Sequence, residues 1–260
     1  MNSLVKTFAM SAALVASAGA FAAPVTIGGV TWDLTDPAGF TATDTMYEST
    51  VTNVGDVLKG YGKILTIQGL EQADFCSGCE LTYRFTYTLD SITGNKFTFK
   101  DGLIEVFVDH SPNWVFNDAS TAADGTPWLV MAGHTTYDDE TGKAGTLHSD
   151  ATPTSFTVSG SGNGFLDVVG GLAADYFNTN TFAVEEDAGG TTGFADFQFT
   201  SSFQLRRTPI VGPDGTVYRM FGSNDFQGFS QEVPEPASLA LIGVALAGLG
   251  LGRRRQLKSK

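Results

Sequence analysis

Two cysteines separated by two residues, Cys76-Ser77-Gly78-Cys79, form the segment of this chain with the clearest chemistry. Such a pair can close a disulfide, act as a redox dithiol, attach haem or provide part of a zinc site. Haem attachment requires a histidine after the second cysteine, where Glu80 stands, and zinc requires two further ligands, although no second C-x-x-C is present. A redox dithiol normally opens a helix, whereas a strand pattern follows here. The motif therefore favours a structural disulfide, with redox and metal roles as weaker alternatives.

Carboxylates in predicted loops are the second set of candidate ligands. They lie on both sides of a predicted strand at 127–133 and could bind Ca²⁺, which takes about six to eight oxygen ligands. The chain has neither an EF-hand loop nor an RTX nonapeptide. Solvated turns are the more common role of such acids, so calcium is a hypothesis for five residues: Asp118, Asp124, Asp138, Asp139 and Glu140.

The sequence patterns of familiar catalytic sites are absent. The chain contains no G-x-S-x-G elbow, no H-E-x-x-H helix and no phosphate-binding loop. Its three histidines, His110, His134 and His148, are scattered along the chain. With 28 acids present, a pair at the spacing that glycosidases need arises by chance. We therefore predict no catalytic residues and no required cofactor.

Strands must position these groups, because apolar and polar residues alternate over long stretches. The stretch 81–90 alternates strictly, and 197–205 repeats the pattern through Phe197, Phe199, Phe203 and Leu205. The stretch 104–109 alternates except that Phe107 interrupts the polar face. A period of two residues means that one face is buried and the other is solvated. The residues expected to face the core are Leu81, Tyr83, Phe85, Tyr87, Leu89, Ile104, Val106, Val108, Phe197, Phe199, Phe203 and Leu205.

Shorter strand patterns and frequent turns complete the predicted fold. Thr93-Gly94-Asn95 reads as a tight turn, the glycine-rich run 160–164 reads as a flexible turn, and 173–177 could form one short helical turn. No internal repeat or proline-rich linker is present within 23–232. We therefore predict an all-β protein with a single antiparallel β-sandwich or jelly-roll-like domain. Its further strands are expected at 25–33, 46–54, 62–68, 95–100, 127–133, 154–159, 164–169, 181–185, 216–221 and 226–231.

The two ends of the chain carry targeting patterns. Residues 1–22 read as a secretory signal peptide, with Lys6 before an apolar stretch and an Ala20-Phe21-Ala22 cleavage site. The region 23–232 is then the exported domain. It holds 27 of the 28 acids and nine of the 15 bases, a net charge of −18. This charge excludes nucleic acid as a partner and disfavours an anionic membrane surface. Export also suits the predicted disulfide, because thiols oxidise outside the cytoplasm.

The C-terminal segment 233–260 combines three elements. Val233-Pro234-Glu235-Pro236 is extended by its prolines, 237–252 is apolar, and 253–260 is basic and begins with Arg253, Arg254 and Arg255. Sixteen helical residues span about 24 Å, short of the ~30 Å hydrocarbon core. A short glycine-rich span suits one transmembrane helix that a membrane enzyme processes, with an ordinary single-span anchor as the alternative.

This tail resembles the PEP-CTERM sorting signal of Gram-negative bacteria, a type of tail that also follows some ice-binding proteins. The resemblance implies an inner-membrane anchor through 237–252 with the domain in the periplasm, cleavage near Pro234-Glu235-Pro236 by an exosortase, and release to the cell surface or the extracellular matrix. The segments 60–62, 75–83, 106–109 and 123–129 are similar to exported domains of other PEP-CTERM proteins, which implies a shared fold only.

These observations predict an exported, non-catalytic protein of the cell surface or biofilm matrix. The resemblance implies a structural or exopolysaccharide-associated role, because PEP-CTERM proteins accompany exopolysaccharide production. The alternatives are a secreted hydrolase acting on polysaccharide and a Ca²⁺-dependent carbohydrate-binding module, for which Trp114 and Trp128 could stack on sugars. Ice binding needs flat threonine arrays from repeats, and no repeat is visible.

Overall fold

The computed structural model describes residues 24–153 and 158–233. The predicted signal peptide, the apolar span 237–252 and most of the strand candidate 154–159 lie outside these residues. Within them, no helix is long and apolar enough to cross a membrane. The elements are β1 (Val25–Ile27), β2 (Val30–Trp32), β3 (Phe40–Ser49), β4 (Val57–Ile67), β5 (Leu70–Glu71), α1 (Gln72–Phe75), β6 (Glu80–Thr93), β7 (Lys96–Asp109), η1 (Ala119–Ala122), β8 (Thr126–His134), β9 (Thr136–Asp138), β10 (Lys143–Gly145), β11 (Leu147–Pro153), β12 (Val158–Gly170), α2 (Ala174–Phe177), β13 (Phe182–Glu185), β14 (Thr192–Ala195), β15 (Phe197–Val211) and β16 (Val217–Gly228).

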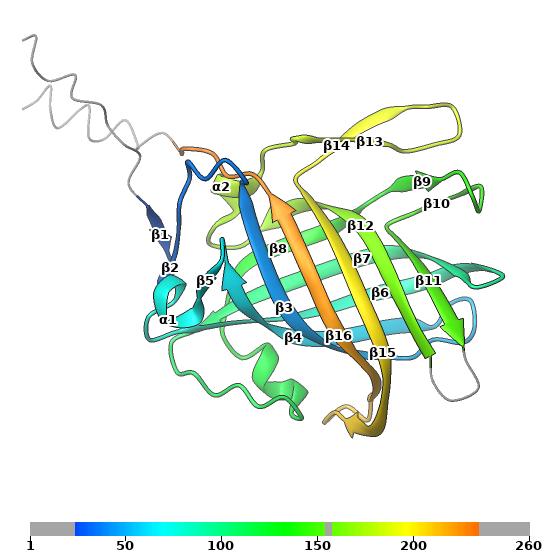
Figure 1. Cartoon of the computed structure of the whole chain (residues 1–260), viewed down its shortest axis with the longest axis horizontal. Coiled ribbons are helices and arrows are strands. Elements are labelled where there is room, and N and C mark those ends of the chain that lie inside the picture. The colour runs from blue at the N-terminus through cyan, green and yellow to red at the C-terminus, as the bar shows by residue number, and fades with distance from the viewer. Residues whose placement is uncertain (1–23, 154–157, 234–260) are drawn as a thin grey trace, which may run out of the picture.

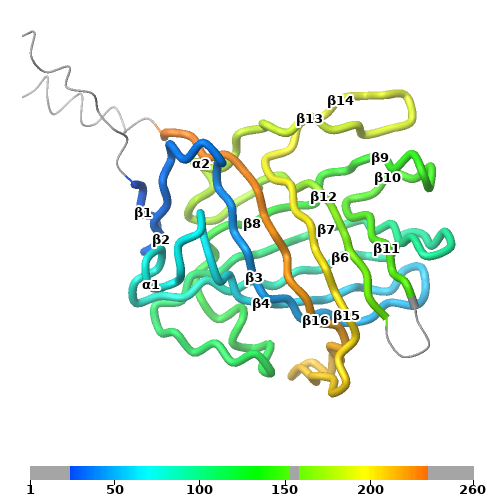
Figure 2. The backbone as a smooth tube through the Cα atoms, in the orientation of Figure 1, coloured from blue at the N-terminus to red at the C-terminus, as the bar shows by residue number. Residues whose placement is uncertain are grey.

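One ten-stranded antiparallel sheet forms most of the described structure. Its strands follow the order β11-β12-β15-β16-β3-β4-β6-β7-β8, and β5 pairs with β4. The sheet then closes on itself, because β8 also pairs with β12 and β11 also pairs with β7. In Figure 1 the layer that contains β3, β16, β15 and β12 crosses the layer that contains β6, β7 and β8. The β13–β14 hairpin projects from the end of this body (Figure 2).

This topology confirms the predicted all-β antiparallel class. The finer prediction of a two-sheet sandwich or jelly roll is not confirmed, because ten of the described strands hydrogen-bond in one continuous closed sheet, and the other six form three separate two-stranded pairs. Two pairs of predicted strands are also joined. The candidates 95–100 and 104–109 lie in the single strand β7. The strand β16 joins the candidate 216–221 to the start of the candidate 226–231 and ends at Gly228. Asp101, at φ 55°, adopts a left-handed conformation where the β6–β7 register shifts, so the chain makes a bulge there and not a turn.

The interior of the closed sheet is filled by the apolar face of each strand. The inward residues of β6 predicted from alternation, Leu81 to Leu89, are all buried, and so are Phe197 and Phe199 of β15. The partly buried Phe203 packs against the same core, whereas Leu205 is 36% exposed. Inward side chains from facing sides of the closed sheet thus form a single core. Their inward orientation follows from the two-residue period of the sequence.

Glycines opposite aromatic rings allow the rings to lie flat against the sheet. Gly160 pairs with Phe203 and Gly164 pairs with Phe199 across β12 and β15. A Cβ atom on Gly160 would overlap the Phe203 ring, so the ring occupies space that any other residue would fill. The run 160–164 is therefore part of strand β12, and its prediction as a flexible turn was wrong. The glycines there serve side-chain packing across the sheet.

Aromatic residues close one end of the interior. Trp32 stacks on Phe177 with ring centroids 5.1 Å apart and meets Trp128 edge-on at 5.8 Å. Phe40 contacts Phe177 at 4.8 Å. The Trp128 indole also donates a hydrogen bond of 3.0 Å to the carbonyl of Ile27. Trp128 is 1% exposed, so its proposed role as a sugar-stacking surface is wrong, and its burial closes this end of the sheet.

Candidate functional site

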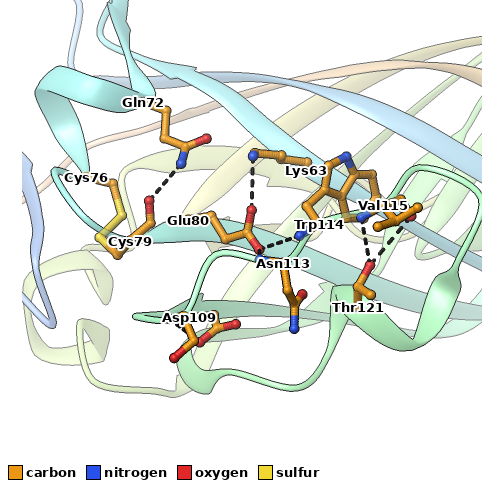
Figure 3. Close-up of polar contacts among 11 residues, drawn as sticks. Lys63, Gln72, Cys76, Cys79, Glu80, Asp109, Asn113, Trp114, Val115 and Thr121 are labelled. Atoms are coloured by element: carbon orange, nitrogen blue, oxygen red, sulfur yellow. Dashed lines mark hydrogen bonds and ion pairs between the residues drawn. A yellow bond between two sulfur atoms is a disulfide. The ribbon is translucent and has the colours of Figure 1, made fainter.

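The two cysteines form the Cys76–Cys79 disulfide, with Cα atoms 5.1 Å apart (Figure 3). Cys76 directly follows the short helix α1, and β6 begins one residue after Cys79. Gln72 donates a hydrogen bond of 2.7 Å to the Cys79 carbonyl, which ties the helix to the turn. Both cysteines are buried, whereas redox-active pairs are partly exposed. The placement agrees with a structural disulfide at the start of β6.

A buried ion pair beside the disulfide holds a long loop against the outside of the sheet. The Glu80 carboxylate, at the start of β6, lies 3.0 Å from the Lys63 ammonium and accepts hydrogen bonds from the backbone N–H groups of Asn113 and Trp114 at 2.7 and 2.8 Å (Figure 3). The Trp114 ring then packs on Tyr61 at 5.9 Å. Glu80 is 1% exposed, so this contact is structural and fixes the loop that follows β7.

Two of the predicted calcium ligands stabilise that same loop. The Asp118 side chain caps η1, because it accepts hydrogen bonds from the N–H and the hydroxyl of Ser120 at 3.0 and 2.6 Å. These bonds hold the pKa of Asp118 below its usual value. Asp124 accepts a hydrogen bond of 2.8 Å from the Asn113 amide. Both carboxylates thus have partners within the loop.

The other three candidates lie at the turn between β9 and β10. Asp138 accepts hydrogen bonds from the Glu140 N–H at 3.0 Å and the Thr141 hydroxyl at 2.9 Å. The Glu140 carboxylate pairs with Lys96 at 2.8 Å, and Asp139 occupies the same turn. Across residues 24–153 and 158–233, no group of three or more histidines, cysteines or acids is placed to hold a metal ion. The structure therefore does not bring the five candidates together as a ligand set.

A histidine between two carboxylates forms a polar cluster that sequence patterns did not reveal. The Nδ1 atom of His134, on β8, lies 2.8 Å from the Asp167 carboxylate of β12, and its Nε2 atom lies 3.2 Å from Glu186. Glu186 follows β13, so the cluster joins that hairpin to the closed sheet. The pairing of β8 with β12 brings His134 and Asp167 together, and Glu186 reaches them from the end of β13.

The most site-like feature is a cavity of about 350 Å³ at the end of the sheet opposite the aromatic cluster. This volume lies within the range of small-molecule sites, about 300–1,000 Å³. A smaller void of about 20 Å³ continues inward and shares several lining residues with it. The described residues that line the main cavity are Glu48, Ser49, Thr50, Val51, Thr52, Leu58, Phe97, Phe99, Leu147, Ser149, Ala151, Val158, Gly162, Ser201, Phe203, Leu205 and Met220.

Glu48 is the only charged residue among these described lining residues. It lies on β3 in the inward phase of the strand, after Met46, and is 7% exposed. Burial raises the pKa of its carboxyl to about 8. Since no described residue bonds its side chain, this carboxyl is protonated at neutral pH and faces an apolar chamber.

Tyr87, on β6, is a second polar residue at the inner end of the cavity. It lines the small inner void together with Glu48. Its hydroxyl is buried and has no hydrogen-bond partner among the described residues. Burial raises the pKa of this hydroxyl well above its usual value, so it stays protonated. An unpartnered buried hydroxyl is uncommon in folded proteins and calls for an explanation.

A neighbouring buried acid shows the contrasting, satisfied arrangement. Asp44 accepts hydrogen bonds from the backbone N–H and side-chain amide of Asn224 at 2.8 and 3.3 Å. The same amide donates to the Tyr83 hydroxyl at 3.0 Å, and that hydroxyl donates to the Thr45 carbonyl at 3.0 Å. Burial still raises the pKa of Asp44 to about 7. The core thus provides partners for Asp44 but none among the described residues for Glu48.

Sequence reasoning missed both cavity groups, although one signal was present. Glu48 stands two residues after Met46 in a predicted strand, at a position where alternation calls for an inward apolar side chain. A carboxyl at an inward position is the pattern that could have marked it. Tyr87 gave no such signal, because a tyrosine suits the inward face of β6 like its neighbours.

The fold and cavity define a class of protein: a closed antiparallel sheet with an interior chamber beside an otherwise well-filled core. The C-terminal segment identifies the chain further. Residues 232–256 match the PEP-CTERM protein-sorting motif, so the chain carries a PEP-CTERM sorting signal at this end. The prediction from the tail is thereby confirmed. Neither the curated proteins nor the solved structures give a significant match to the chain.

Proposed function

We propose that this chain is a non-catalytic binding protein of the cell surface or extracellular matrix, which holds a small, largely apolar molecule inside its closed sheet. The PEP-CTERM motif implies export and processing by an exosortase. The proposed route runs through an inner-membrane anchor, with the domain in the periplasm, to release at the cell surface.

The cavity is the observation that carries the binding proposal. Four of its lining residues, Leu58, Phe99, Leu147 and Phe203, pack in or against the main core of the sheet. Apolar side chains that surround an open chamber forfeit contacts that a ligand would restore. Protein interiors are close-packed, so side chains normally fill a space of this volume unless a ligand occupies it. A small apolar ligand is therefore the occupant that suits the chamber best.

The same lining argues against the alternatives. A glycosidase needs two carboxylates facing its substrate, and Glu48 is the single acid among the described lining residues. A Ca²⁺-dependent carbohydrate module needs converging oxygen ligands, which the acidic turns do not supply in the described structure. An exopolysaccharide-associated role remains a proposal that rests on the sorting motif. If Ca²⁺ has no site, melting curves in excess calcium and in chelator will coincide.

A pair of neighbouring substitutions tests cavity binding. Ser201 lines the chamber, whereas the next residue, Ser202, is exposed on the opposite face of β15. Ser201→Phe should fill the chamber and abolish saturable binding of an uncharged fluorescent probe such as N-phenylnaphthylamine. Ser202→Phe adds the same group outside and should bind the probe like the wild type. Equal binding by both variants, or none by the wild type, would refute the proposal.

A further inference from the structure

The structure assigns a head-group site to the inner end of this cavity: we propose that Glu48 and Tyr87 donate hydrogen bonds to the carbonyl oxygen of an otherwise apolar, uncharged ligand. This inference rests on the binding function proposed above and specifies which class of molecule the chamber selects. The ligand would be a ketone, an ester or a similar carbonyl compound, with its hydrocarbon part in the wider outer chamber.

Glu48 and Tyr87 come from different strands and line the same void. Glu48 projects inward from β3 and Tyr87 projects inward from β6, and both line the inner void of about 20 Å³. Glu48 is 7% exposed and Tyr87 is 2% exposed. Neither has a hydrogen-bond partner in residues 24–153 and 158–233. Two buried polar groups without partners beside the same void carry a free-energy cost that a ligand oxygen would remove.

The surroundings show why the ligand group should be uncharged. The other described residues around the inner void are Met46, Leu58, Phe85, Ile104, Leu147, Phe199, Ser201 and Asn224, and none of them carries a charge. The Asn224 amide is already bonded to Asp44 and to Tyr83. Burying a charge without a partner is costly, so an ionic head group has little to stabilise it here.

The protonation state shows why the ligand group should be an acceptor. Burial keeps Glu48 protonated at neutral pH, and a carboxylic acid held neutral in an apolar site acts as a hydrogen-bond donor. Tyr87 provides a second O–H donor. A carbonyl oxygen accepts two hydrogen bonds through its two lone pairs and donates none. It therefore matches both donors at once, whereas an ammonium group could use Glu48 only after that carboxyl lost its proton.

A competition experiment with matched ligands tests this head-group site. Methyl hexyl ketone, n-octane and n-octylamine are compared by displacement of N-phenylnaphthylamine from the purified protein, at pH about 6 and about 10, two units on either side of the Glu48 pKa of about 8. At the lower pH the ketone should bind about 10-fold tighter than octane, because it gains two hydrogen bonds. At the higher pH this preference should fall to about 3-fold, because only Tyr87 still donates.

Variants separate the two donors. Glu48→Gln keeps an N–H donor that does not titrate, so its ketone preference should be the same at both pH values. Tyr87→Phe should weaken ketone binding about 3-fold and leave octane binding unchanged. Glu71→Gln, at an exposed position on β5, serves as the matched control and should behave like the wild type.

The outcomes distinguish this inference from the function on which it rests. Equal affinity for ketone and octane at pH about 6 would overturn the head-group site while leaving apolar binding in place. Tightest binding by octylamine at that pH, where Glu48 is protonated, would overturn it in favour of a cationic ligand. A preference for ketone that is independent of pH in the wild type would contradict the role of Glu48. Failure of the wild type to bind the probe at all would overturn both proposals together.

Discussion

Glu48→Gln should make the free energy of unfolding less dependent on pH, because the wild type becomes less stable as Glu48 ionises at high pH. Burial raises the pKa of this carboxyl from 4.5 to about 8 in the folded protein. The folded state therefore holds the proton more tightly than the unfolded chain does. The stabilisation that results is fully present below pH about 4.5 and is lost progressively as the pH rises through about 8.

The magnitude follows from the interval between the two pKa values, about 3.5 pH units, at ~1.4 kcal/mol for each unit. The total is about 5 kcal/mol as an upper bound, because water that enters the chamber would reduce it. Between pH 7 and pH 9 the free energy of unfolding of the wild type should fall by about 1–2 kcal/mol because of the ionisation of Glu48. Asp44, with a pKa of about 7, titrates mainly at lower pH and is present in both proteins.

Urea unfolding at several pH values between about 5 and 9 measures this difference. The wild type should become less stable across the range, and Glu48→Gln should lose less, with the largest gap between the two proteins above pH 8. The Glu71→Gln control should follow the wild type. Identical pH dependence in wild type and Glu48→Gln would refute the reasoning, because it would mean that Glu48 ionises in the folded state as easily as in the unfolded chain.

Three further perturbations test other parts of the structure. Replacing Cys76 and Cys79 by Ser should cost about 2 kcal/mol of unfolding free energy, and thiol labelling of the denatured, non-reduced wild type should find no free thiol. Glu80→Ala leaves the partly buried Lys63 ammonium and two backbone N–H groups without their partner, so it should cost about 3 kcal/mol of unfolding free energy and expose the 110–125 loop to protease. An uncleaved loop would contradict the role of Glu80 as an anchor. Replacing both Pro234 and Glu235 by Ala should block tail removal as followed by mass spectrometry, and unchanged processing would argue for a plain anchor.

Alternation in the sequence was sufficient to predict the strands that form the core. The two-residue period of β6 and β15 identified inward residues such as Tyr83 and Phe199, because only one face of each strand is buried. The turn predicted at Gly94 is also confirmed, since β6 ends at Thr93, β7 begins at Lys96 and the φ of Gly94 is 64°. These features depend on local sequence, which is why they could be predicted.

Closure of the sheet could not be predicted, because it depends on pairing between distant strands. β8 and β11 each pair with both β7 and β12, and no local pattern specifies these partners. The glycine run 160–164 looked like a turn by composition alone. The glycines are needed because the rings of Phe199 and Phe203, on the paired strand β15, lie against them. The cavity was missed for the same reason, since its described lining residues come from seven strands that the sequence separates widely.

Crystallography of the protein with a bromine-labelled apolar ketone tests ligand binding in the closed sheet most directly. We predict an anomalous bromine peak inside the chamber bounded by Leu58, Phe99 and Phe203, with the carbonyl oxygen toward Glu48 and Tyr87. An empty chamber at high ligand concentration, or a ligand found only on the outer surface of the sheet, would contradict the proposal that this PEP-CTERM protein binds a small molecule in its interior.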